Sequence, residues 1–447
     1  MSDRRLASLT TDIPGPKAQA YIARDREVVS PSLSRSYPFV MERGLGSLVW
    51  DVDGNRYIDF SAGIAVAATG HAHPKVVQAI QDQAARFLHM SGAVFYYAAQ
   101  IDLAEKLSSL VPGDEPKQVL FTNSGAEAVE SALKLVRYHS KRPRLLAFLG
   151  AFHGRTMGAL SLTASKVVQR RGFAPLVPGV THVPYGYCYR CAYNLEYPGC
   201  DLHCVDYIEE TLFKHLVPGD EVGAIFVEPI QGEGGYVVPP PGYHERLKDL
   251  ADRWGILLVA DEIQMGVGRT GKWFSIEHWG VAPDITVVAK GIASGMPLGA
   301  MVARKDLMDW PSGAHATTFG GNPVSCAAAA ATIQVIEEEG LLQNAERMGL
   351  RVQRSLKEMQ SRHPSIGDVR GKGLAVGAEL VRDPETKEPA SELRDQVVKK
   401  AFAKGLLLLG CGSSTLRFMP ALTIDADTVD EGMAIFEEVL SAAERAK

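Results

Sequence analysis

Short apolar runs alternate with amphipathic helical patterns from about residue 76 onward. Five of these runs are too short for helices and are rich in branched side chains, which is typical of strands buried on both faces of a parallel sheet. The pattern therefore predicts an α/β fold with a large domain built on a mostly parallel central sheet. The five runs cover residues 119–121, 145–148, 224–227, 256–260 and 285–288.

The N-terminal part of the chain departs from this pattern. The first 45 residues are irregular and rich in Pro and Ser, which suits an arm more than a domain. Residues 47–60 then predict a hairpin, because apolar residues flank Asp53-Gly54, a type I′ turn signal.

The C-terminal part changes pattern again. An Ala-rich helix over 327–339 is closed by Gly340, and strand candidates at 374–380 and 406–409 follow among amphipathic helices. This pattern predicts a smaller α+β domain. We expect three parts: an N-terminal arm and hairpin over 1–70 that belong to the small domain, a large domain over 71–325, and a C-terminal small domain over 326–447.

Composition and charge exclude several classes of function. The chain has 447 residues, of which 46% are hydrophobic and 22% charged, and its net charge of -5 gives no basic field for nucleic acid. No apolar run reaches the roughly 20 residues that span a bilayer. The first 15 residues contain no apolar signal core. We therefore expect a cytoplasmic protein with neither nucleic acid nor membrane as a partner.

Ligands of open α/β sheets bind beyond the carboxyl ends of the strands, so the residues there carry the functional argument. After the first run comes a helix start with Ser124, Gly125 and Ala126, whose free backbone N–H groups form an anion cradle. The alternative is plain helix capping by Asn123 or Ser124. After the second run come Phe152 and Arg155, which suit either ordinary packing or a ring over a flat cofactor and a grip on a carboxylate.

The remaining strand ends carry charged residues. Glu228 ends one run, and Asp261 and Glu262 end the next, where neighbouring residues face opposite sides and have different roles. Lys290 ends the last run, and poor solvation there would lower its pKa and make it a nucleophile. An anion cradle, a stacking ring, a carboxylate for a pyridinium N–H and a nucleophilic lysine together match pyridoxal 5′-phosphate (PLP).

With these motifs the chain resembles the class-III (ω-amino) aminotransferases of PLP fold-type I. The likeness extends over nearly the whole chain, from Val49-Trp50-Asp51-Val52-Asp53-Gly54 to Leu416-Arg417-Phe418. The other matching segments are Gly70-His71-Ala72-His73-Pro74, Asn123-Ser124-Gly125-Ala126-Glu127-Ala128, Phe152-His153-Gly154-Arg155-Thr156, Glu228-Pro229-Ile230-Gln231-Gly232-Glu233-Gly234-Gly235, Asp261-Glu262-Ile263-Gln264 and Lys290-Gly291.

The resemblance implies a role for each matching cofactor residue, within the large domain. Lys290 would bind PLP covalently and then move a proton between Cα of the substrate and C4′ of the cofactor, while Asp261 would keep the pyridine nitrogen protonated. Gln264 would bond the ring oxygen and Phe152 would stack on the ring, with His153 and Glu228 in the same site. Ser124, Gly125 and Ala126 would hold the phosphate. Thr318 matches a threonine that reaches the phosphate from the partner subunit, which implies a homodimer or a dimer of dimers.

The resemblance also implies a substrate site. Arg417 matches the arginine that grips the α-carboxylate of glutamate or 2-oxoglutarate, Glu228 the carboxylate that pairs with it when an ω-amine is bound, and Arg155 the arginine for the distal carboxylate. Ile64 stands where ornithine-specific relatives have a tyrosine, which favours 4-aminobutyrate or another aliphatic ω-amine over ornithine.

We therefore expect a PLP-dependent ω-aminotransferase that passes an amino group from 4-aminobutyrate, ornithine or a similar donor to 2-oxoglutarate by a ping-pong mechanism. An amino-acid racemase or aminomutase of the same fold is the main alternative, and a non-enzymatic PLP-binding regulator is the second.

Four of the six cysteines form a separate cluster: Cys188, Cys191, Cys200 and Cys204. Four thiols at this spacing could bind zinc tetrahedrally. PLP chemistry needs no metal, so the sequence leaves open whether the cluster binds zinc or consists of free or redox-labile thiols.

Overall fold

The computed structural model describes residues 5–445 and contains three sheets. The largest has seven strands in the order β4-β10-β9-β8-β7-β5-β6, and β10 runs antiparallel to both of its neighbours while the other strands are mutually parallel. This confirms the predicted fold class. The strands are β4 (Lys117–Thr122), β5 (Arg144–Phe148), β6 (Val180–Val183), β7 (Val222–Val227), β8 (Leu257–Asp261), β9 (Ile285–Val288) and β10 (Gly299–Arg304).

All five predicted strands of this sheet are present, and β6 and β10 are additions to the prediction. β6 is a half-buried edge strand with two polar residues, and β10 is built largely from small residues, so neither has a strong apolar signal. Strand alternation explains why the inner strands are apolar throughout. Leu145 and Ala224 face one core and Leu146 and Ile225 the other, because helices cover both faces of the sheet.

Helices complete the two cores. α5 (Gly125–Ser140) packs on β7 to β10 with its apolar side, and α10 (Pro323–Glu338) packs against α3 and α4. The Ala-rich face of α10 permits this close approach, and the helix ends just before Gly340, whose φ is +61°. The other helices of this part are α3 (Pro74–Arg86), α4 (Ala98–Leu110), α6 (Met157–Leu162), α7 (His203–Tyr207), α8 (Phe213–His215) and α9 (Tyr243–Trp254).

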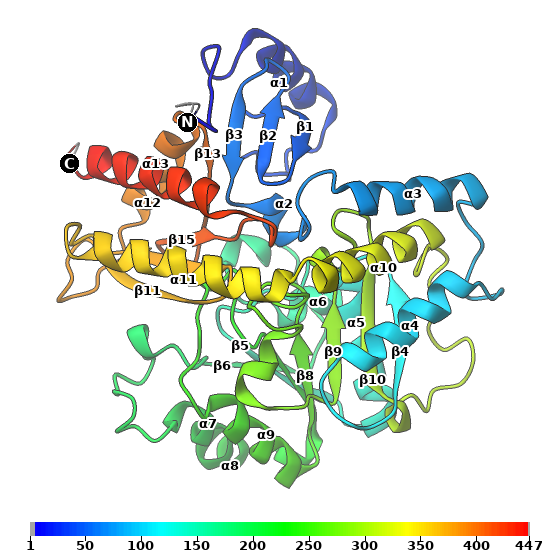
Figure 1. Cartoon of the computed structure of the whole chain (residues 1–447). Helices are drawn as coiled ribbons and strands as arrows, with labels where there is room; N and C mark the ends of the chain where they lie inside the picture. Colours follow the sequence, from blue (N-terminus) through cyan, green and yellow to red (C-terminus); the bar gives the residue numbers. More distant parts are fainter. Residues whose placement is uncertain (1–4, 446–447) are drawn as a thin grey trace.

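The N-terminal hairpin shares a sheet with the C-terminal part of the chain. After α1 (Pro16–Val28) come β1 (Met41–Leu45), β2 (Leu48–Asp51) and β3 (Arg56–Asp59), and β13 (Leu406–Leu407) pairs in parallel with β3. Figure 1 shows these strands close to the C-terminal helices and apart from the large sheet. The predicted hairpin is present. The assignment of 1–70 to the small domain stays a prediction, and residues 1–4 of that range lie outside the described residues.

The predicted type I′ turn of this hairpin is wrong. A type I′ turn needs positive φ at both central residues, but only Gly54 has one, at +89°. The reason is loop length: β2 ends at Asp51 and β3 begins at Arg56, so four residues rather than two connect the strands, and Asp51 N–H donates to Asn55 O across the turn.

The C-terminal region forms a third sheet in the order β11-β12-β15-β14, and its strands are antiparallel. The strand predicted at 374–380 is β12, whereas the one predicted at 406–409 is divided between β13 and the start of β14. Among the described residues, no helix is long and apolar enough to cross a membrane. The elements are α11 (Leu341–Gln360), β11 (Ile366–Lys372), β12 (Ala375–Leu380), α12 (Ser391–Phe402), β14 (Leu409–Cys411), β15 (Thr415–Phe418) and α13 (Ala426–Glu444).

Candidate active site

A cavity of about 400 Å³ lies at the carboxyl ends of the parallel strands. Its walls come from the segments that follow β4, β5, β7, β8 and β9, together with Val66 and the turn that precedes β10. The chain therefore brings together most of the residues selected from the sequence. These are Ser124, Gly125, Ala126, Phe152, His153, Arg155, Glu228, Asp261, Gln264 and Lys290.

One end of the cavity is the N-terminus of α5. Ser124 is the N-cap, and its side chain accepts a bond from Glu127 N–H at 3.2 Å, so the capping interpretation is correct. The cap uses the N–H of Glu127. The N–H groups of Gly125 and Ala126 have no partner within the helix, so they stay available for an anion. A Cβ on Gly125 would lie 2.7 Å from Ile263 Cδ1, so glycine is the residue that fits here. This end suits a phosphate.

Asp261 lies in the wall of the cavity and is held on both carboxylate oxygens. Its Oδ2 is 2.7 Å from His153 Nδ1, and its Oδ1 accepts Ile263 N–H at 3.0 Å. Burial lowers the pKa of His153, but the bond to Asp261 together with the charges of Asp261 and Glu228 outweighs burial, so the pKa is raised. The two contacts hold the Asp261 carboxylate in a fixed orientation. Glu262 faces away and bonds Ser275 and Ile276, as strand alternation predicts.

Glu228 joins two loops of the site. Its carboxylate accepts Phe152 N–H and Gly232 N–H, both at 2.9 Å. Burial raises the pKa of Glu228 to about 7, although the charge of His153 opposes the shift. The Glu228 carboxylate therefore ties the loop that carries Phe152 to the loop that carries Gly232.

Lys290 follows β9 directly and has a left-handed φ of +46°. Burial lowers the pKa of Lys290, while the charges of Asp261 and Glu228 oppose the shift. The amine is therefore neutral, and so nucleophilic, at lower pH than an exposed lysine.

The cavity fits PLP. Gln264 is buried and lines the cavity, and its side-chain Oε1 has no hydrogen-bond partner among residues 5–445. The Nε2 of the same amide is the group that can donate to the ring oxygen. The N-terminus of α5 suits the phosphate, Asp261 the pyridine nitrogen, Phe152 the ring face and Lys290 the aldehyde carbon.

Arg417 does not pair with Glu228 as predicted. Its Nη1 lies 2.5 Å from Oε1 of Glu233, five residues further along the same run, while Glu228 is occupied by the two backbone N–H groups. The pair is mostly buried, and Lys166 Nζ lies 3.6 Å from the other oxygen of Glu233. Despite burial, Arg417 and Lys166 lower the pKa of Glu233. The charges of Glu233 and Arg417 also act on the pKa of Lys290: Glu233 raises it and Arg417 lowers it.

Three predicted residues, Arg417, Ile64 and Thr318, are not among those that line the cavity. Ile64 is 46% exposed and belongs to α2 (Ala62–Ala65), a turn in which all four residues have positive φ. Val66, two residues later, lines the cavity instead. Thr318 is exposed, as expected if it serves the site of a partner subunit, a role that stays a prediction.

The cysteine cluster lies apart from this site. Its four thiols are free and line one small cavity of about 20 Å³. Within residues 5–445, no group of three or more His, Cys, Asp or Glu side chains is arranged to hold a metal ion. The structure thus gives no support to the zinc interpretation of Cys188, Cys191, Cys200 and Cys204.

Comparison with known proteins agrees with this geometry. Residues 29–440 match the family model for class-III aminotransferases. The chain is 42% identical to an alanine/serine racemase from Pyrococcus horikoshii, covering 96% of this chain and 91% of the relative. It is 40% identical to a 5-aminovalerate aminotransferase from Pseudomonas aeruginosa, covering 94% and 97%. The structure of an ornithine aminotransferase from Toxoplasma gondii superposes with a TM-score of 0.84 at 32% identity, covering 96% of each chain.

The chain therefore belongs to the class-III aminotransferase family. It is an enzyme of PLP fold-type I, and PLP is its cofactor. The two relatives differ in the reaction that their names give, so family membership leaves the substrate to the site residues.

We expect Lys290→Ala to abolish covalent attachment of PLP. In the apoprotein of the unmodified chain, attachment should increase with pH at a lower pH than for an exposed lysine, because the pKa of Lys290 is lowered. Borohydride reduction followed by peptide mass spectrometry measures both effects. Labelling of the variant at another lysine, such as Lys166, would contradict the assignment.

Proposed function

We propose that this enzyme is an ω-aminotransferase that uses 2-oxoglutarate as amino acceptor. The observation that carries the proposal is the ion pair between Arg417 and Glu233, whose charges act on the pKa of Lys290, with Arg155 in the cavity wall. An arginine that is neutralised by a movable carboxylate suits a pocket that accepts a dicarboxylate in one half-reaction and a terminal amine in the other.

The cofactor residues act in the roles implied by the resemblance. Bound PLP supplies an electron sink for the electrons released at the substrate Cα. Lys290 binds the cofactor and later carries the proton, and its lowered pKa makes the neutral amine available. Asp261, backed by His153, holds the ring nitrogen, and Ser124, Gly125 and Ala126 hold the phosphate.

The substrate residues select between two kinds of ligand. With 4-aminobutyrate, ornithine or 5-aminovalerate as donor, Glu233 neutralises Arg417 and leaves room for an uncharged carbon next to the amine. With 2-oxoglutarate, Glu233 moves away and Arg417 binds the α-carboxylate, while Arg155 binds the distal carboxylate. Glu233 here takes the switching role that the sequence assigned to Glu228, because Glu228 is fixed by backbone bonds. The exchange of donor for acceptor at one site makes the mechanism ping-pong.

An amino-acid racemase is the second candidate, favoured by the similarity to the Pyrococcus horikoshii relative. Racemisation needs the same lysine and cofactor but returns the proton to Cα, and it has no use for a second carboxylate site. The position of Arg155 in the cavity wall favours the transaminase.

Titration of the holoenzyme with a panel of amino donors, without acceptor, separates the two. We expect 4-aminobutyrate or a similar ω-amine to convert the lysine-bound cofactor to its aminated form, seen as a change in absorbance. A cofactor spectrum that survives every donor, together with loss of optical rotation of an amino acid, would establish the racemase instead.

Arg417→Ala should raise KM for 2-oxoglutarate on the order of 100-fold, since loss of one partner of a buried charge pair costs about 2–5 kcal/mol. Glu233→Gln should act in the opposite sense. It leaves Arg417 charged next to an ω-amine donor, so KM for the donor rises while KM for 2-oxoglutarate falls. Steady-state kinetics with both substrates measure this split. Equal changes for both substrates in either variant would contradict the switching role.

We propose further that the enzyme is at least a homodimer and works in the cytoplasm. Exposed apolar side chains surround Thr318: Phe319 is 60% exposed, and Tyr96 is 95% exposed. The segment that carries Tyr96 lies beside the Thr318 loop, because Asn322 Nδ2 bonds Leu88 O at 3.0 Å and Tyr97 bonds Gly321 O at 2.5 Å. A partner subunit that covers this patch would be reached by Thr318.

Phe319→Asp should shift the assembly toward monomers and weaken retention of PLP, because the charge is buried on association. Analytical ultracentrifugation and dialysis of the holoenzyme measure the two effects. Leu216→Asp, at an equally exposed apolar residue near α8, is the control and should change neither. A monomeric unmodified enzyme with full activity would contradict the proposal.

A further inference from the structure

Two arginines of the C-terminal sheet lie in one row across its strands. Arg370 of β11 pairs with Gly377 of β12, and Gly377 pairs with Arg417 of β15. Directly paired residues of antiparallel strands face the same side, and strands lie about 4.8 Å apart. The two arginines therefore project from the same face, with a position that lacks a side chain between them.

The loop that carries Glu233 lies over this bare position. A Cβ added to Gly377 would lie 3.1 Å from Tyr236 Cβ, 3.1 Å from Thr415 Cγ2 and 3.5 Å from Gly235 O. The loop backbone thus occupies the space between the two arginines, and any side chain at 377 would push it outward.

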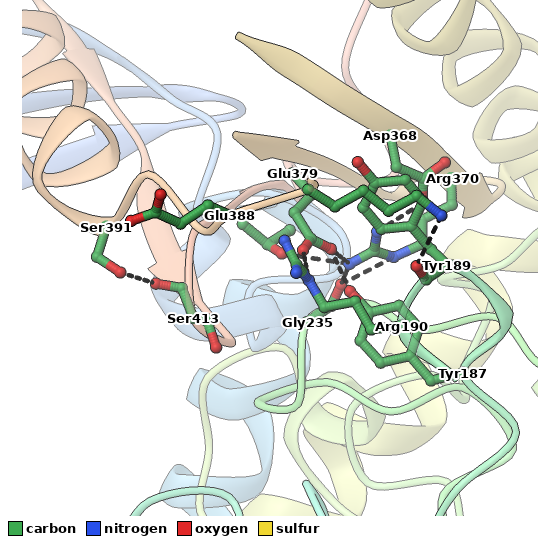
Figure 2. A network of polar contacts seen from close by, with 12 residues as sticks. Tyr187, Tyr189, Arg190, Gly235, Asp368, Arg370, Glu379, Glu388, Ser391 and Ser413 are labelled. Atoms are coloured by element: carbon green, nitrogen blue, oxygen red, sulfur yellow. Dashed lines mark hydrogen bonds and ion pairs between the residues drawn. The ribbon is translucent and has the colours of Figure 1, made fainter. Parts of the chain in front are cut away.

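Arg370 holds the loop on one side. Its Nη2 donates to Gly235 O at 2.6 Å, and its Nε donates to Gly235 O and Tyr236 O, both at 3.2 Å. Asp368 at 2.6 Å and Glu379 at 2.8 Å orient the guanidinium. Figure 2 shows this network, in which Tyr187 and Arg190 also bind Glu379.

Arg417 holds the same loop on the other side through the Glu233 carboxylate, and Gly412 N–H donates to Glu233 O at 2.8 Å. The backbone of the loop is therefore fixed by the small sheet at both ends. Within that frame the Glu233 side chain is the part that changes partner.

We infer that Arg370 and Gly377 are positioning residues that hold Glu233 against Arg417 and so set how readily Arg417 accepts a substrate carboxylate. The inference rests on the proposed function. A ligand carboxylate must displace Glu233 from Arg417, so the energy of the internal pair is subtracted from the affinity for that ligand.

Weakening the contacts that Arg370 and Gly377 make with the loop therefore changes the affinities for two kinds of ligand differently. A dicarboxylate binds more tightly, because the internal competitor is weaker, whereas a monocarboxylate that leaves the pair intact gains nothing. A general structural defect would weaken both ligands. The difference between the two ligands is thus the signature of positioning.

The test uses holoenzyme and calorimetric titration with glutarate and valerate, which share a five-carbon chain and carry two carboxylates and one. Arg370→Lys keeps the charge but loses the planar fork that binds both carbonyls. Gly377→Ala displaces the loop without changing any charge. Arg190→Lys is the control, since Arg190 binds Glu379 in the same network but the structure gives it no bond to the loop.

We expect Arg370→Lys and Gly377→Ala each to lower the Kd of glutarate by about fivefold, somewhat less than the effect of a full charge-assisted hydrogen bond. The Kd of valerate should not fall, and Arg190→Lys should leave both within about twofold. Glutarate bound equally or more weakly by the folded variants would overturn the inference and leave the proposed function standing. An unmodified holoenzyme that does not bind glutarate would overturn the proposed function, and the inference with it.

Discussion

Because β5, β7, β8 and β9 run in parallel, each strand must deliver its following residues at the same edge of the sheet. That constraint collects Phe152, Glu228, Asp261 and Lys290 from segments far apart in the sequence into one cavity. The strands are apolar because both faces are covered, so the first polar residue after each strand is placed where water is scarce. The chemistry of the site follows from this placement.

Charged side chains that are buried away from water need hydrogen bonds or opposite charges as partners. Asp261 is 2.7 Å from the imidazole of His153, Glu228 accepts two backbone N–H groups, and Lys290 lines the same cavity as both carboxylates. Burial raises the pKa of Glu228 to about 7 and lowers that of Lys290. The site therefore combines a carboxylate held in a fixed orientation, for the ring nitrogen, with an amine that gives up its proton more readily than an exposed lysine.

The small C-terminal sheet completes the site from the other side. It contributes Arg417. Arg370 of the same sheet also binds the backbone of the loop that carries Glu233, the partner of Arg417. The two carboxylates of one short run thus have separate tasks. Glu228 is immobilised by backbone bonds within the large domain, and Glu233 lies at the junction with the small sheet, where the proposed change of partner would alter which ligand fits.

The sequence by itself determined five of the seven strands of the large sheet, the order of polar residues after them and hence the cofactor, because these depend on local pattern and on the rule that parallel strands end at one edge. The family model and the similar proteins confirm that part. Tertiary structure decided the rest. The sequence does not show which of the two glutamates, Glu228 or Glu233, pairs with Arg417. Packing in the folded chain places Glu233 against Arg417. Whether Ile64 or Val66 faces the cavity depends on a turn of four residues with positive φ. The pattern of side chains does not predict such a turn. The row Arg370–Gly377–Arg417 exists only through strand pairing between segments that are far apart in the chain, and pairing register is a property of the folded sheet.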